Sequence, residues 1–373
     1  MHEPAIEYSI ASPYGNLPVK KEKLHFPLEG DKAATAYKKY FWAIKTFISQ
    51  NHYALLLSSI AEKLNHSVSL KEIKKISIRA QKHGAFYHPA SIEIVINNQT
   101  INLGVNVATE KSKIEWLKKE FFLLKNLGKT FKDLSYLPKV FGADYVGDMF
   151  ITLVEWFDDY HEFHLSLDEK KQPKIIFWDF KNGYRYLHKE EEFRLYKEIA
   201  KILTLYYNIK TFSQIYPWHH AAGDFVANIK HNKIAVKLTT VRGYEPIVGF
   251  IKDNNINPIF ALIQFFLILS LKMRLDKFDG IGEIGWLGNF CVKATVEGFF
   301  EALKIKEREM IQICEVSCNE FLELLKSFTE KEIEALFAPL LDWYHREKDF
   351  PVIMDNIKEH KKSLYLFIQE FPL

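Results

Sequence analysis

Cysteine is scarce in this chain of 373 residues, which contains only Cys291, Cys314 and Cys318. An odd number of cysteines does not suit a disulfide framework, and no nearby histidine or further cysteine completes a zinc site in the sequence. We therefore expect buried free thiols, which suit the reducing cytoplasm.

Signals for secretion and for membrane insertion are also lacking. The first residues, MHEPAIEYSIASPYGNLP, have neither the basic start nor the apolar centre of a signal peptide. The most apolar run covers residues 258–273 but includes Gln264 and Lys272, and a transmembrane helix needs about 20 predominantly apolar residues. We expect a buried helix in this run, and a cytoplasmic protein without a membrane partner.

Charge of one sign is not in excess either, because 50 Lys and Arg face 47 Asp and Glu, for a net charge of +3. Bulk electrostatics therefore indicate neither nucleic acid nor an anionic membrane as a partner, and any anion site must be local. The hydrophobic fraction of 48% and the 30 Phe residues are typical of an ordinary globular protein. At this length two packed lobes are expected.

Secondary-structure patterns are clear along most of the chain. Residues 31–65 carry apolar groups at helical spacing in two successive pieces, behind a start signal at Gly30 and Asp31. Three strand patterns follow at 73–81, 91–96 and 101–108, which we predict to be antiparallel.

The second part of the pattern begins with an amphipathic helix from residue 111 that we expect to end at Gly128. Two strands then flank the turn pair Gly147 and Asp148, which predicts a hairpin. Beyond Asp158 strand signals are few. The remaining elements are a long helix at 191–212, a short hairpin at 225–241, and helices after about residue 255.

The order of these elements, with the stretch HHAAGDFVAN at 219–228, resembles the protein-kinase-like fold in the branch of aminoglycoside and choline phosphotransferases. The resemblance covers roughly residues 73–300 and implies an α+β, two-lobed fold. Its small lobe would be a five-stranded antiparallel sheet, its large lobe mostly helical, and a helical N-terminal extension would precede both. The corresponding domains are 1–70, 71–157 and 158–373.

The resemblance also implies roles for individual residues. Asp224 would be the base that orients the acceptor hydroxyl, and Asn228, together with Asp224, would bind Mg²⁺. Glu120 stands where the family's small-lobe helix carries the carboxylate that pairs with the lysine of the third strand and so orders the small lobe. Trp156 would begin a hinge, WFDDY, whose backbone binds an adenine. ATP and Mg²⁺ are the cofactors this implies.

The sequence departs from the family's pattern at several of these positions. Asn106 stands where the third strand of the family carries a phosphate-binding lysine, so another lysine would have to replace it. The loop KHGAFYHPA has only one glycine, so it lacks the small residues that let backbone amides close over phosphates. The family places its main magnesium ligand near Thr240, but here no carboxylate follows until Glu245. The candidate replacement lysines are Lys111, Lys113 and Lys237.

The polar residues around Asp224 allow more than one interpretation. His220 belongs to a catalytic loop, to a zinc site with His219 and Asp224, or to a simple polar turn. Arg242 either binds an anionic group or pairs with Asp224, in which case it lowers the pKa of Asp224 and suppresses its role as a base.

A second motif, FDGIGEIGWLG from residue 278, matches the spacing of a dinucleotide-binding loop. The pattern before it is helical, however, so a glycine-rich loop between helices is expected instead.

Two functions from different classes remain open at this point. The first is a kinase-like small-molecule phosphotransferase or nucleotide-binding protein with a divergent active site, whose ligand is a small molecule or nucleotide and not nucleic acid. The second is a catalytically inactive pseudokinase that acts as a binding or scaffold protein for a protein partner. The second hypothesis predicts a contact between Arg242 and Asp224.

Overall fold

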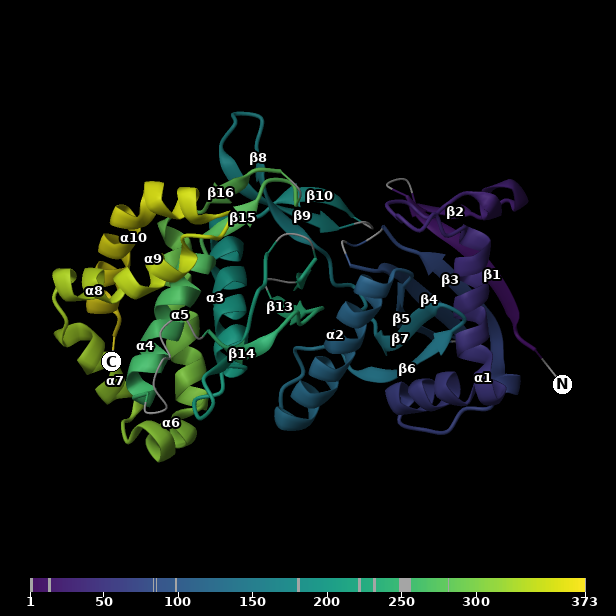
Figure 1. Cartoon of the computed structure of the whole chain (residues 1–373), viewed down its shortest axis with the longest axis horizontal. Coiled ribbons are helices and arrows are strands. Elements are labelled where there is room, and N and C mark those ends of the chain that lie inside the picture. Colours follow the sequence, from purple (N-terminus) through teal and green to yellow (C-terminus); the bar gives the residue numbers. More distant parts are fainter. Residues whose placement is uncertain are drawn as a thin grey trace. The chain divides into compact units, whose positions relative to one another are not determined.

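The computed structural model describes residues 3–12, 15–82, 84, 86–97, 99–179, 182–220, 223–230, 233–247, 256–280 and 282–372. Their contacts divide the chain into two compact units, Met1–Asp159 and Tyr160–Leu373 (Figure 1). Both units combine strands with helices, which confirms the predicted α+β class. Within the described ranges, no helix has the length and apolar character needed to cross a membrane.

The first unit is built on one seven-stranded sheet with the order β2-β1-β3-β4-β5-β7-β6. The five strands that the sequence predicted are present, but β1 and β2 add two more, and β1 runs parallel to β3. Ile6, Tyr8 and Ile10 explain the extra pairing, because they alternate along β1 and pack against the hydrophobic core. The strands are β1 (Ala5–Ser12), β2 (Gly15–Pro18), β3 (Ile73–Ala80), β4 (His88–Ile96), β5 (Gln99–Ala108), β6 (Val140–Val146) and β7 (Met149–Glu155).

Two long helices, α1 (Tyr37–Leu64) and α2 (Lys111–Thr130), belong to this sheet (Figure 1). Along β5, Leu103, Val105 and Val107 point to the core that includes α1, whereas Ala108 lies in a second cluster with α2. Because side chains alternate along a strand, the two helices cover opposite faces of the sheet. Two short 3-10 helices also belong to the described part of this unit, η1 (Lys21–His25) and η2 (Leu70–Glu72).

The helix α1 is interrupted once, as the two apolar pieces in the sequence predicted. Its backbone leaves the helical region from Gln50 to Tyr53, and three of these residues have positive φ angles. Two details differ from prediction. The helix begins at Tyr37 and not behind Asp31, and α2 continues past Gly128 to Thr130.

Asp31 has a different role, because it accepts hydrogen bonds from the Thr35 backbone N–H at 2.8 Å and from the Thr109 hydroxyl at 2.9 Å. The His88 Nε2 atom lies 3.6 Å from the same carboxylate. Burial opposes ionisation of Asp31, yet these hydrogen bonds and His88 lower its pKa. The carboxylate therefore ties the loop before α1 to the ends of β4 and β5.

The second unit contains more strands than the sequence predicted. A three-stranded sheet, β10-β9-β8, precedes the first long helix, and β11, β14, β15 and β16 form two further small pairs. The predicted glycine-rich loop from residue 278 includes the turn of the β15–β16 hairpin, in which Gly285 pairs with Asp276. Short strands with few residues carry too little periodicity to be recognised from sequence.

Helices make up most of the remainder, and α3 ends at Leu205 instead of extending to residue 212. The strands are β8 (Phe163–Leu167), β9 (Pro173–Asp179), β10 (Gly183–Tyr186), β11 (Ser213–Ile215), β12 (Phe225–Lys230), β13 (Lys233–Leu238), β14 (Tyr244–Pro246), β15 (Leu275–Lys277) and β16 (Ile284–Trp286). The helices are α3 (Lys189–Leu205), α4 (Pro258–Lys272), α5 (Asn289–Ile305), α6 (Glu307–Cys314), α7 (Cys318–Ser327), α8 (Glu330–Leu336), α9 (Ala338–Tyr344) and α10 (Phe350–Glu370).

The core of the second unit is organised around α4, whose side chains are buried from Leu262 to Lys272. This confirms the prediction of a buried helix. Lys272 forms an ion pair of 2.7 Å with Asp349, and both side chains are nearly inaccessible to solvent. A charged side chain is tolerated inside a core only when it is paired in this way.

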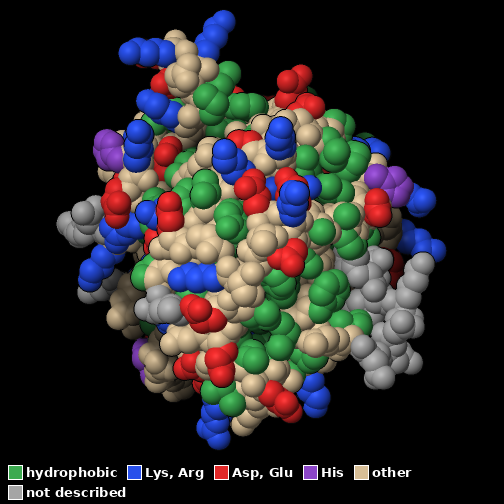
Figure 2. All heavy atoms as spheres, turned by 90° about the vertical axis from the view of Figure 1, so that its left-hand side faces the viewer, with side chains coloured by type: hydrophobic (Ala, Val, Ile, Leu, Met, Phe, Trp, Pro, Cys, Tyr) green, Lys and Arg blue, Asp and Glu red, His purple; other side chains and the backbone are tan. Residues whose placement is uncertain are grey.

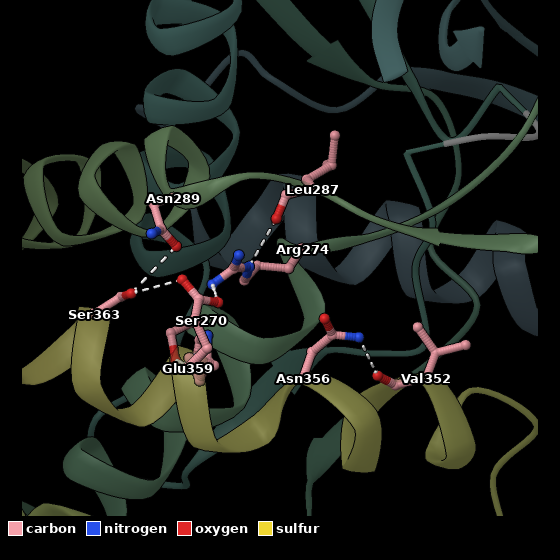
Figure 3. A network of polar contacts seen from close by, with 9 residues as sticks. Ser270, Arg274, Leu287, Asn289, Val352, Asn356, Glu359 and Ser363 are labelled. Carbon is pink, nitrogen blue, oxygen red and sulfur yellow. Dashed lines mark hydrogen bonds and ion pairs between the residues drawn. The ribbon is translucent and has the colours of Figure 1, made fainter. Parts of the chain in front are cut away.

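A second polar network links the end of α4 to α10 (Figure 3). Arg274 donates from Nε to the Leu287 carbonyl at 2.8 Å, and its Nη1 atom lies 3.2 Å from Glu359. The Ser363 hydroxyl donates to Glu359 at 3.0 Å and lies 3.2 Å from the Asn289 amide oxygen. Through Leu287 and Asn289, these contacts tie α10 to the end of β16 and the start of α5.

Charges on the molecular face seen in Figure 2 are mixed, with Lys and Arg side chains interspersed among Asp, Glu and hydrophobic groups. This agrees with the small net charge of +3.

Candidate functional site

The stretch that resembles a catalytic loop connects β11 to β12 in the second unit. Gly223 has a φ of +72°, and a Cβ atom there would lie 2.9 Å from the Glu162 Oε1 atom. Asp224 accepts a backbone hydrogen bond from Thr239 at 2.8 Å, which extends the pairing of β12 and β13 by one residue. The loop is therefore tightly held at its second half.

Asp224, the proposed base, is buried with 1% of its surface exposed. Its Oδ2 atom accepts a hydrogen bond of 2.9 Å from the His219 backbone N–H, and its Oδ1 atom forms an ion pair with Arg242 Nη2. The predicted contact between Arg242 and Asp224 is thus confirmed. A carboxylate held by two donors is a weak base and has little freedom to orient an acceptor hydroxyl.

His220, the second proposed catalytic residue, has no exposed surface. Its Nε2 atom lies 3.2 Å from the Met273 carbonyl oxygen, to which it donates, and its ring packs 4.7 Å from that of Tyr196 and 5.2 Å from that of Trp218. Burial lowers the pKa of His220 to about 3. It is a neutral residue of the core and is out of reach of a substrate.

His219 is partly buried beside several cations. Burial lowers its pKa to about 4, and the charges of Lys272, Arg242 and Lys277 act in the same direction. Across the part of the chain that the structure describes, no group of three or more His, Cys, Asp and Glu is arranged to hold a metal. The alternative of a zinc site with His219, His220 and Asp224 is therefore not supported.

Asn228, the proposed magnesium ligand, lies within β12 opposite Ala235. Asn228 is four residues along the extended chain from Asp224, so the two Cα atoms are about 13 Å apart. Two short side chains and two Mg–O bonds of about 2.1 Å are together too short to bridge that distance. Because Asp224 is also paired with Arg242, this pair of residues does not fit a shared Mg²⁺ ion.

Lys237, one candidate replacement for the missing lysine, is in β13 opposite Val226. It is on the same face of the hairpin as Asn228, since side chains alternate along both strands. Lys113 instead pairs with Glu110 at 2.7 Å, and Lys111 is exposed at the start of α2.

The remaining predicted residues belong to the first unit. Glu120 is buried in α2 with 6% exposure, and Asn106 lies half-buried in β5 opposite Thr152. Trp156 follows β7, and its ring packs over Gly104, where a Cβ atom would lie 3.6 Å from the indole. The indole therefore covers a part of the sheet face on which Asn106 lies.

Two residues that the sequence did not single out also shape these positions. Lys63, at the end of α1, donates to the carbonyl oxygen of Asn102 at 2.9 Å and to that of Trp156 at 3.5 Å. Glu162 lies against Gly223 and 3.3 Å from His164. The contacts of Lys63, and that of Glu162 with Gly223, join residues far apart in sequence, so no local pattern predicts them.

Comparisons with known proteins give little further information. No protein-family model matches the chain, and no curated protein matches it. A solved structure described as a kinase domain matches 79% of this chain and 85% of its own, at 14% identity and a TM-score of 0.29. A TM-score this low carries no argument about fold or function.

The buried histidines predict a loss of stability in mild acid. The pKa of His220 is about 3 in the folded chain and 6.5 when exposed, so the unfolded chain takes up a proton first as the pH falls. Below about pH 6.5 the free energy of unfolding should therefore decrease, by up to about 1.4 kcal/mol per pH unit for this residue. Urea denaturation between pH 7 and pH 5 measures the slope.

The control for this prediction is the slope of two variants. His220→Phe should flatten it, whereas His25→Gln, at an exposed position, should leave it unchanged. An identical slope in the wild type and in His220→Phe would show that another group causes the acid sensitivity.

Proposed function

We propose that this chain is a kinase-like protein that does not transfer phosphate, a pseudokinase that acts as a binding or scaffold protein. The order of its elements supports the kinase-like plan. In the first unit β3, β4 and β5 precede α2, and β6 and β7 follow it; in the second unit α3, the loop, the β12–β13 hairpin and further helices follow in turn.

The observation that carries the proposal is the ion pair between Arg242 and the buried Asp224. Phosphoryl transfer depends on placing charge around the phosphates and on a carboxylate free to orient the nucleophile. Here an internal guanidinium neutralises that carboxylate. Freeing the Asp224 carboxylate for catalysis would leave it buried without its Arg242 partner, which is energetically costly.

The residues expected to bind nucleotide support the same proposal. Asn106 cannot provide the positive charge of the family's lysine, and Asn228 lies too far along β12 to share a metal with Asp224. The carbonyl of Trp156, which a hinge would offer to an adenine, already accepts a hydrogen bond from Lys63. A phosphotransferase would need at least the first two of these features restored.

A thermal-shift titration of the full chain with ATP and MgCl₂ tests the proposal. A ligand at 100 times its Kd stabilises the folded state by about 2.7 kcal/mol, which shifts the melting temperature by several degrees. We expect no shift at about 1 mM ATP with Mg²⁺, well above a typical micromolar Kd.

A saturable shift with ATP and Mg²⁺ that disappears in Asp224→Asn, but not in the control Asp355→Asn, would instead support a phosphotransferase. Asp355 is exposed on α10 and therefore reports only on the change of charge.

A further inference from the structure

We infer that the outward face of α2 is a docking surface for a membrane that contains anionic phospholipids. This inference does not depend on whether the chain transfers phosphate. It rests on the charge and the exposed aromatic residues of one helix.

The outward face of α2 is strongly basic. The inward side buries Ile114, Leu117 and Leu124, and at 100° per residue the opposite side is centred on Phe122. Five lysines lie within about 60° of Phe122 on this helical geometry, and Glu115 is the acidic residue among them. The lysines of this face, which we call the α2 basic face, are Lys111, Lys118, Lys119, Lys125 and Lys129.

The charge of this face is mostly uncompensated inside the molecule. Glu115 lies 3.3 Å from Lys118 and offsets that one charge. Among the described residues the other four lysines of the α2 basic face have no ion-pair partner. Lys111 is in the first turn of α2, where a positive charge opposes the helix dipole. A lysine at this position therefore does not stabilise α2 through the helix dipole.

Aromatic groups protrude from the same face. Phe122 is 58% exposed and Tyr145, at the end of β6, is 45% exposed. The Lys118 ammonium lies 5.0 Å from the centre of the Tyr145 ring, which places this tyrosine beside the basic face. Single exposed apolar residues are common on proteins, but here they are surrounded by lysines.

The shape of the feature distinguishes between partners of the same charge. An acidic peptide normally docks its side chains into a groove or pocket, whereas Phe122 projects outward from a convex helix. Clusters of lysines on a helix are typical of surfaces that bind anionic lipids, and an exposed aromatic ring beside them suits the headgroup region. The net charge of +3 sums over the whole chain and does not show this local basic face, so composition alone indicated no membrane partner.

Co-sedimentation of the full chain with lipid vesicles tests the inference. We expect binding to vesicles of phosphatidylcholine with phosphatidylserine, little binding to phosphatidylcholine alone, and weakening by salt. Phe122→Ser and the double variant Lys119→Glu with Lys125→Glu should each weaken binding, the latter about tenfold or more.

The matched controls lie on α10, which carries exposed lysines and an exposed leucine. Lys358→Glu with Lys362→Glu makes the same change in charge, and Leu366→Ser removes an apolar group that is 44% exposed. Both should bind vesicles as the wild type does. Equal losses in the α10 variants, or equal binding to neutral and anionic vesicles, would overturn the inference.

Binding to nucleic acid is the other outcome to measure, since a basic face with aromatic residues also suits a phosphate backbone. The same variants are titrated against a fluorescein-labelled single-stranded oligonucleotide. Oligonucleotide binding that is lost in Lys119→Glu with Lys125→Glu, without sedimentation on anionic vesicles, would assign the surface to nucleic acid and contradict the membrane inference.

Discussion

Replacing Arg242 by alanine is expected to lower the free energy of unfolding by about 3–5 kcal/mol, because the buried Asp224 carboxylate loses its ion-pair partner. The Asp224 side chain is 2% exposed and that of Arg242 is 14% exposed. Asp224→Ala should cost less than Arg242→Ala, since the longer arginine side chain can turn toward water while the carboxylate cannot. Urea denaturation at neutral pH measures both.

The double variant completes this test. Asp224→Ala with Arg242→Ala should cost less than the sum of the two single changes, with a coupling of about 1–3 kcal/mol. Arg308→Ala, at an exposed position on α6, is the control and should change stability by no more than about 0.5 kcal/mol. If Arg242→Ala lowers the free energy of unfolding no more than the control does, the ion pair does not stabilise the loop.

Replacing Gly298 by alanine should be almost as damaging, although it adds only one methyl group. Gly298 lies where α5 packs against α3, and a Cβ atom there would overlap the carbonyl oxygen of Lys197. It would also lie 3.0 Å from the Cβ atom of Ala200. Backbone atoms cannot move aside as a flexible side chain can, so we expect a loss of about 2–3 kcal/mol, measured by thermal or urea denaturation.

Gly128 offers a matched control, since it is also within a helix but has no atom within 4 Å of the place where a Cβ would lie. Gly128→Ala should raise stability by about 0.5–1 kcal/mol, because alanine is the better helix former. A stabilising Gly298→Ala would mean that α3 and α5 do not approach as closely as described.

Much of the fold follows from local patterns in the sequence. The hairpin of β6 and β7 turns at Gly147, whose φ of +61° favours glycine, and the apolar run from Pro258 forms a buried helix. The two pieces of α1 follow their apolar spacing in the same way. In each case the residues that predict the element are the same short stretch of chain that forms it.

Features that depend on distant partners were not predictable to the same degree. The alternation of Ile6 and Tyr8 indicates a strand, but its parallel pairing with β3 joins segments more than sixty residues apart. Asn228 has the residue type of a metal ligand, yet hairpin pairing places it within a strand. The sequence left the partner of Arg242 open between an anionic ligand and Asp224, and only the three-dimensional arrangement decides between them.

We propose that the Arg242 guanidinium keeps Asp224 from acting as a catalytic base. The most direct measurement is release of phosphate from γ-labelled ATP with Mg²⁺, by the purified full chain and by Asp224→Asn. We expect both proteins to release phosphate at the rate of the buffer alone. Turnover by the wild type that Asp224→Asn abolishes would contradict it.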